Sequence, residues 1–155
     1  MKNVILITNS FPFGIVEAGF LAPEYEVLKE KADVYTVTRN TKDKMTTSVP
    51  EDRVFRYASH YGKSAFVYFL KALVSPMYYR ELAYLKREKK LTFSNAKRAL
   101  TTLMRAFHFE TFLKKVRSRA DGECVLYTYW NDYTALAAAL AAKNGDRVVS
   151  RIHRA

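Results

Sequence analysis

Residues 3–24, NVILITNSFPFGIVEAGFLAPE, decide the fold that the rest of the chain is expected to adopt. They contain an apolar run, Val4 to Ile7, a loop that proline and glycine interrupt, and a helix that starts near Phe20. An unbroken apolar run is typical of a strand that helices cover on both faces. A strand, a tight loop and a helix in this order begin an α/β domain whose loop faces a ligand. The sequence therefore predicts a strand over residues 2–8, a loop over 9–19 and a helix over 20–32.

Two further strands are expected before residue 60. Residues 33–39, DVYTVTR, are rich in β-branched and aromatic side chains and follow the helix directly. They complete a βαβ unit, whose crossover should be right-handed. A polar loop over residues 40–52 leads to RVFRY at 53–57, which predicts a short edge strand.

Residues of about 60–120 have little strand character and predict a helical insert. A first helix over 63–74 has an apolar face that contains Phe66, Phe69, Leu70 and Leu73. Ser75-Pro76 is typical of an N-cap followed by proline, so a second helix is expected to about residue 90. Thr92 or Ser94 caps a third, long helix that Asp121-Gly122 ends.

The chain then returns to strand at 123–129, ECVLYTY, and an alanine-rich helix follows from Asn131 or Asp132 to Lys143. Residues 147–152, RVVSRI, predict the last strand. The expected fold class is α/β: one Rossmann-like three-layer α/β/α domain over residues 1–155, with a mainly parallel sheet in the order 3-2-1-4-5. In this order, three segments should meet at the carboxyl edge of the sheet: the loop after the first strand, Tyr129-Trp130-Asn131 and His153-Arg154.

The net charge is +11, and residues 60–120 account for it with 14 Lys or Arg against 3 Asp or Glu. Such a local field attracts nucleic acid, an anionic membrane surface or phosphorylated ligands. The densest run contains Lys86, Arg87, Lys89 and Lys90. Three interpretations stay open: a solvated helix face, a surface that binds anionic lipid headgroups beside interleaved aromatic residues, and a nucleic-acid surface, which is the least favoured.

Several classes of protein are excluded or disfavoured. No apolar run approaches the roughly 18 residues of a membrane span, and no signal peptide is recognisable. The single cysteine, Cys124, opens a strand and predicts a buried thiol in a reducing, cytoplasmic compartment. The histidines have no metal-ligand spacing, so no metal site is expected.

The loop after the first strand contains neither a G-x-G-x-x-G nor a G-x-x-x-x-G-K-[ST] motif. Phe13 and Gly14 therefore belong either to a plain loop or to a ligand loop of another kind. Glu17 has no obvious ion-pair partner and is either a solvated carboxylate or a ligand-binding group. Trp130 could stack on a ligand, although packing is favoured. His153 could bind a sugar hydroxyl, a phosphate or a carbonyl.

Three pieces of the chain together resemble bacterial GT-B glycosyltransferases of the family 4 (glycosyl transferases group 1) type. TNSFPFG at 8–14 with Glu17, Phe20-Leu21 and Glu24 is similar to the family's FPYG…GE.FL..E opening. LYTYW at 126–130 looks like the YTYW before the alanine-rich helix, and SRIHRA at 150–155 resembles the start of SRAHGYDLY. The insert is similar only in being helical and basic.

The resemblance implies a retaining, hexosyltransferase-type enzyme that transfers sugar from a nucleotide-sugar to a sugar or lipid-linked acceptor in cell-surface polysaccharide synthesis. It implies that His153 is catalytic and lies near the transferred sugar. It implies substrate binding by Phe13, Gly14, Glu17, Tyr129, Trp130 and Arg154, with no metal and no cofactor beside the nucleotide-sugar.

The resemblance also implies that this chain is the acceptor-side half of a GT-B fold. The family's donor half carries an E-x7-E motif, and no two glutamates here are eight residues apart. The expectation is therefore an N-terminal domain without its C-terminal donor domain, inactive alone, that works as a peripheral protein at the inner face of the membrane. The alternative is a non-enzymatic basic α/β module that binds nucleic acid or a partner subunit.

Overall fold

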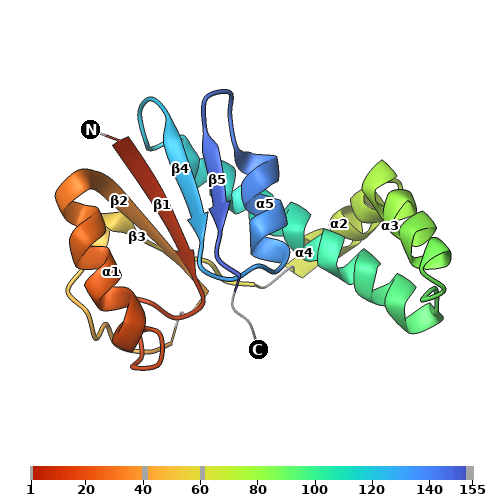
Figure 1. Ribbon diagram of the computed structural model, residues 1–155, viewed down its shortest axis with the longest axis horizontal. Coiled ribbons are helices and arrows are strands. Elements are labelled where there is room, and N and C mark those ends of the chain that lie inside the picture. The colour runs from red at the N-terminus through yellow and green to blue at the C-terminus, as the bar shows by residue number, and fades with distance from the viewer. Residues whose placement is uncertain (1, 40–41, 60–61, 153–155) are drawn as a thin grey trace.

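The centre of the molecule is a sheet of five parallel strands in the order β3-β2-β1-β4-β5 (Figure 1). The computed structural model describes residues 2–39, 42–59 and 62–152. The strands are β1 (Lys2–Thr8), β2 (Ala32–Thr38), β3 (Val54–Arg56), β4 (Cys124–Thr128) and β5 (Arg147–Ser150). The predicted α/β class, parallel sheet and strand order are confirmed.

Helices cover both faces of the sheet because β1 is apolar on both sides. Residues 3–8 of β1 are all buried, and they pair with β2 on one side and β4 on the other. Val4 and Leu6 pack under α1 (Ala18–Lys31), beside Leu21. Ile5 and Ile7 face α4 (Phe93–Arg117) and α5 (Tyr133–Ala141). This arrangement is the three-layer packing that the unbroken apolar run predicts.

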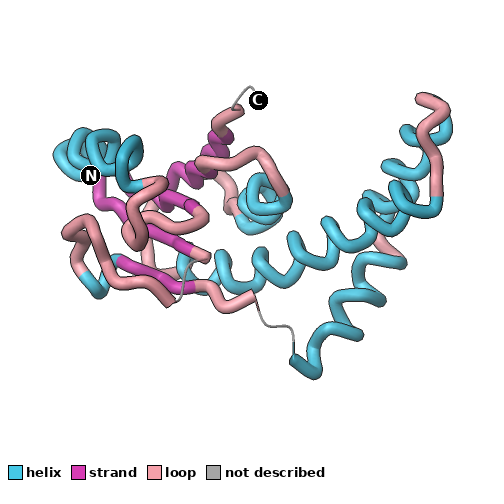
Figure 2. The backbone as a smooth tube through the Cα atoms, turned by 90° about the horizontal axis from the view of Figure 1, so that it is seen from below, coloured by secondary structure: helices cyan, strands magenta, loops and turns pink. Residues whose placement is uncertain are grey.

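The helical insert projects from one side of the sheet (Figure 1). It comprises α2 (Ala65–Leu73), α3 (Pro76–Arg87) and the first half of α4, and 3-10 turns precede β3 (Glu51–Arg53) and α2 (Gly62–Ser64). The long helix α4 runs from the far end of the insert back to the sheet (Figure 2). A separate apolar cluster around Ala72, Leu103 and Phe107 holds the insert together.

Two of the insert's expected features need correction. Phe66 is 66% exposed and Leu70 is 41% exposed, whereas Ala72 is fully buried. The small Ala72 side chain packs with α4 beside Tyr68, so Phe66 and Leu70 point outward while Phe69 and Leu73 are half-buried. The α3 helix ends at Arg87 rather than near residue 90, because Lys89 adopts a left-handed φ of 55° that closes the helix.

Side-chain caps decide the starts of the later helices. Ser75 Oγ accepts a hydrogen bond from the Met77 N–H at 3.3 Å, as the Ser-Pro sequence predicts. Thr92, not Ser94, caps α4 by accepting from the Asn95 N–H at 3.1 Å. Asp132, not Asn131, caps α5 by accepting from the Thr134 N–H at 2.8 Å.

Helix α1 begins at Ala18, two residues earlier than expected, so Pro23 lies inside it rather than in its first turn. The backbone N–H groups of Phe20 and Leu21 already donate to the Glu17 carbonyl. The α5 helix ends at Ala141 because Ala142 is extended, with a ψ of 140°.

A buried ion pair joins the end of α4, the helix that leaves the insert, to the sheet. Arg117 Nε and Nη2 each lie 2.8 Å from an Asp146 carboxylate oxygen, and Arg117 also donates to the carbonyls of Ala120 and Gly122. Asp146 accepts from the backbone N–H groups of Lys143 and Cys124. The end of α4, the start of β4 and the turn before β5 are thereby joined.

Asp146→Asn should destabilise the fold by about 3–5 kcal/mol at pH 7, because it leaves the Arg117 charge buried without its counter-ion. The Arg117 guanidinium, together with two backbone N–H groups, lowers the pKa of Asp146 to about 2. A lowered pKa stabilises the fold fully above the ordinary value of 3.8 and loses this effect as the pH falls through about 2. Urea unfolding should therefore show a difference in the free energy of unfolding between wild type and variant, and this difference should narrow below about pH 4.

The control is Asp33→Asn, which removes the half-exposed ion pair with Arg53 and should cost about 1 kcal/mol or less. Equal effects of the two substitutions would show that the buried pair has no special role.

Lys89→Gly should stabilise the protein by about 1 kcal/mol, because glycine adopts the left-handed conformation without the steric cost of a Cβ atom. The turn has the hydrogen bonds of a Schellman motif, from Lys89 N–H to the Lys86 carbonyl and from Lys90 N–H to the Leu85 carbonyl. Lys89→Ala removes the same charge but keeps the Cβ atom. Thermal unfolding of both variants separates the two effects, and a lower Tm for Lys89→Gly than for Lys89→Ala would contradict the argument.

Candidate functional site

The candidate site lies at the carboxyl edge of the sheet, where the loop after β1 meets the residues that follow β4. Both segments lie beyond the lower ends of their strands in Figure 1. Parallel α/β sheets bind ligands at this edge, next to the strand at which the order reverses. Here that strand is β1, which lies between β2 and β4.

The carboxylate of Glu17 organises the loop. It accepts hydrogen bonds from the backbone N–H groups of Asn9, Ser10 and Phe11 at 3.2, 2.5 and 2.8 Å, and from the Ser10 hydroxyl at 3.0 Å. The Trp130 indole Nε1–H donates a further bond at 2.5 Å. Glu17 is only 3% exposed, so the expectation of a solvated carboxylate is wrong.

These donors also decide the ionisation of Glu17. Burial raises its pKa, but the hydrogen bonds from Trp130, Ser10 and Phe11 outweigh burial, and the net pKa is lowered. Glu17 is therefore a carboxylate at neutral pH whose bonds all lie within the protein. A direct contact of Glu17 with substrate stays a prediction.

Phe13 and Gly14 have different positions in the loop. The Phe13 ring is fully buried, with the Arg56 guanidinium 4.1 Å from its centroid. Gly14 has a φ of 72°, which favours glycine, and its carbonyl accepts from the Thr46 hydroxyl at 2.6 Å. Ile15 and Val16 follow at the tip and are 81% and 77% exposed. A ligand at this loop would meet its backbone and its tip rather than the Phe13 ring.

Tyr129 and Trp130 lie against the start of α1, as the strand order predicts. The Tyr129 ring stacks on Phe20 with centroids 5.2 Å apart and is 3% exposed. The Arg151 guanidinium lies 5.1 Å from the Tyr129 centroid. Trp130 is half-buried and packs beside the α1 cluster, in agreement with the favoured packing role.

Two arginines at this edge were not among the expected site residues. Arg39 follows β2, donates to Asn9 Oδ1 and to the Tyr133 hydroxyl at 2.8 Å, and lies 3.4 Å from Asp132. Arg151 follows β5 and pairs with Glu24 at 3.0 Å. From the sequence, both were expected inside strands, at 33–39 and 147–152, whereas β2 ends at Thr38 and β5 at Ser150, so each arginine follows a parallel strand.

Glu24 also accepts a hydrogen bond from the Tyr127 hydroxyl at 2.8 Å. Burial and this bond to a carboxylate raise the pKa of Tyr127 to about 12. Tyr127 therefore stays protonated at neutral pH and ties β4 to the second turn of α1.

The remaining expected site residues fall into two groups. His153 and Arg154 lie outside the described residues, so their roles stay predictions. The junction of α3 and α4, at the far end of the insert (Figure 1), exposes the four basic residues Lys86, Arg87, Lys89 and Lys90.

Two general findings concern the part of the chain that the structure describes. Within it, no three His, Cys, Asp or Glu side chains are placed to hold a metal ion. None of its helices is both long and apolar enough to cross a membrane.

Comparisons with known proteins identify no relative: no family model, curated protein or solved structure matches the chain.

Glu17→Gln should destabilise the protein by about 2 kcal/mol at neutral pH, because an amide cannot satisfy all the donors that converge on the carboxylate. The lowered pKa of Glu17 means that this stabilisation is present above its ordinary pKa and is lost as the pH falls through the lowered value. Urea unfolding at a series of pH values checks this pH dependence.

Trp130 is the only tryptophan, so its fluorescence also reports the loss of the indole hydrogen bond. The control is Glu30→Gln on the exposed side of α1, which should leave stability and emission unchanged. An unaltered emission spectrum in Glu17→Gln would contradict the described contact.

Proposed function

We propose that this chain is the acceptor-side, Rossmann-like domain of a retaining, nucleotide-sugar-dependent glycosyltransferase of the GT-B, family 4 type. One observation carries the proposal. Two segments that resemble the family lie more than a hundred residues apart in the chain, and three pairs of their side chains are in contact. Glu17 accepts from Trp130, Phe20 stacks on Tyr129, and Glu24 accepts from Tyr127. Residues that resemble one family in sequence thus form one contact surface at the ligand edge of the sheet.

The chemistry of this edge suits a diphosphate leaving group. Gly14 has no side chain of its own to block a phosphate, although the Asp43 carboxylate lies beside it. The cations at this edge are Arg39, which pairs with Asp132, and Arg151, which pairs with Glu24. Fixed donors and cations stabilise the charge that develops on a departing diphosphate. In this proposal His153 lies beside the transferred sugar, and Phe13, Glu17, Tyr129, Trp130 and Arg154 shape the acceptor side.

The donor half, with its E-x7-E motif, would be supplied by a second domain, and this domain alone would be inactive. The reading frame that encodes residues 1–155 tests this directly: a second α/β domain with E-x7-E should follow. In the full-length protein, Gly14→Val should abolish sugar transfer from a labelled nucleotide-sugar, and Ala142→Val, just after the end of α5, should not. Absence of the second domain, or full activity of Gly14→Val, would overturn the proposal.

We place the enzyme at the inner face of the membrane because of the turn between α3 and α4. Lys86, Arg87, Lys89 and Lys90 are exposed there. Three apolar or aromatic side chains accompany them: Tyr84 is 48% exposed, Leu91 46% and Phe93 87%. Basic residues beside exposed aromatic ones are suited to an anionic lipid surface.

Changing Lys86, Arg87, Lys89 and Lys90 together to Gln should lower binding to phosphatidylglycerol vesicles by at least about a hundredfold, since each basic residue near the surface contributes about 1 kcal/mol. Vesicle sedimentation measures the partition coefficient. The control changes four cations that are exposed elsewhere to Gln: Lys2, Lys31, Lys44 and Arg147. It should lower vesicle binding much less. Unchanged vesicle binding of the first variant, with a salt-dependent shift of a random DNA duplex, would favour the nucleic-acid alternative instead.

A further inference from the structure

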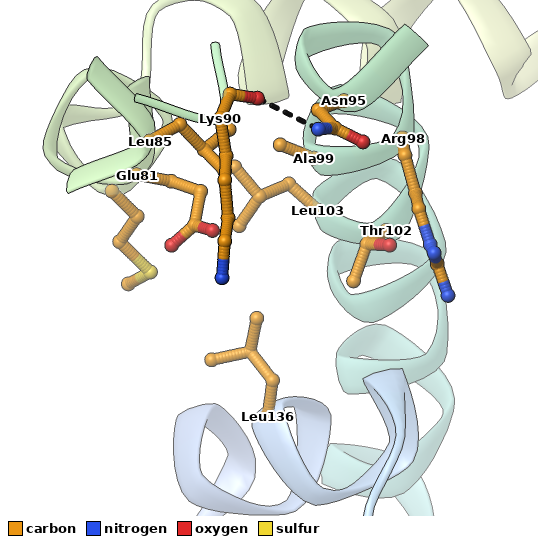
Figure 3. A pocket seen from close by; sticks show the side chains of 10 residues that line it. Glu81, Leu85, Lys90, Asn95, Arg98, Ala99, Thr102, Leu103 and Leu136 are labelled. Carbon is orange, nitrogen blue, oxygen red and sulfur yellow. Dashed lines mark hydrogen bonds between the residues drawn. The ribbon is translucent and has the colours of Figure 1, made fainter. Parts of the chain in front are cut away.

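A cavity of about 620 Å³ lies between α3, α4 and α5 and shares no residue with the candidate site (Figure 3). Its volume falls within the range of roughly 300–1,000 Å³ that is usual for small-molecule sites. Apolar side chains from all three helices form its walls, including Leu85, Leu103 and Leu136. The cavity therefore joins the helical insert to the layer that covers the sheet.

Three charged side chains line the same cavity: Glu81, Lys90 and Arg98. The Lys90 ammonium points into it beside the Glu81 carboxylate, and Arg98 extends along α4 (Figure 3). Among the described residues, these side chains form no hydrogen bond or ion pair with one another or with a neighbour. Two cations against one carboxylate leave the cavity with an excess positive charge.

The backbone holds Lys90 at the cavity. Its N–H donates to the Leu85 carbonyl at 2.8 Å, and its carbonyl accepts from Asn95 Nδ2 at 2.7 Å (Figure 3). The Asn95 N–H is itself bonded to the Thr92 cap. A cation on a backbone tied to both α3 and α4 is partly preorganised, so a ligand loses less conformational entropy in engaging it.

We propose that this cavity binds a single-chain amphiphile with an anionic head group. The chain would lie between Leu85, Leu103 and Leu136, where its burial removes apolar surface from water. The head group would accept a hydrogen bond from Lys90, which is stronger with an ionised acceptor, and Arg98 would add positive charge from the other side of α4. A fatty carboxylate and a lipid phosphate share this chemistry. The inference goes beyond the proposed function, because it requires neither a nucleotide-sugar nor a donor domain.

The experiment titrates the chain, in the absence of vesicles, with dodecanoate, dodecyl phosphate and dodecanol below their aggregation concentrations and measures binding by calorimetry. Saturable one-to-one binding is expected for the two anions, and the stronger of them identifies the head group. Lys90→Gln should weaken anion binding about tenfold, the effect of losing one charge-assisted hydrogen bond, and Arg98→Gln should weaken it by less. Glu81→Gln should strengthen it, because a repelling carboxylate is removed.

Ala99→Phe should abolish binding by filling the cavity from α4, and it leaves the buried Leu103 unchanged in the sequence. Leu136→Gln, on α5, tests the apolar wall from the opposite side, and circular dichroism confirms that each variant is folded. Lys97→Gln is the matched control, because it removes an exposed cation from α4 that does not line the cavity.

Three results would overturn the proposal: no saturable binding of either anion, affinity unchanged in Lys90→Gln, Arg98→Gln and Ala99→Phe, or dodecanol binding as tightly as the anions. The binding assay does not depend on glycosyl transfer, which Gly14→Val tests. The amphiphile proposal and the glycosyltransferase proposal can therefore fail independently.

Discussion

The arrangement of the carboxyl edge depends on one buried carboxylate. Burying Glu17 is unfavourable in itself, and the charge persists because backbone N–H groups and the Trp130 indole donate to it. These bonds fold the loop after β1 around the start of α1 and fasten both to the end of β4. Since β1 is the central strand, this carboxylate positions the loop after β1 and the end of β4 next to the point where the strand order reverses.

The second constraint is the connection from β3, at one edge of the sheet, to β4 on the other side of β1. Helix α4, with 25 residues, spans about 37 Å and covers this distance while it carries the insert outward. Arg117 and Asp146 fix its end to β4 and β5. The insert is thus anchored at the sheet, and its basic turn lies at its far end (Figure 1).

Much of the fold could be predicted because its signals are local. The apolar run of β1, the Ser75-Pro76 cap and the glycines after the helices each act within a few residues. The role of Glu17 could not be predicted in this way, since its partners are backbone N–H groups and a tryptophan 113 residues away. The exposure of Phe66 and Leu70 on α2 could not be predicted either, because periodicity identifies an apolar face but not the helix against which it packs.

The sequence by itself determined the order of strands and helices, the parallel sheet and the concentration of charge in the insert. Hydrophobic periodicity and the short connections between elements are sufficient for these features. Only the tertiary structure decided which polar groups are buried and which cations share a cavity. Such features depend on distances between elements that are remote in the chain. Burial of Glu17 and the grouping of Lys90, Arg98 and Leu136 therefore appear only when the helices are packed.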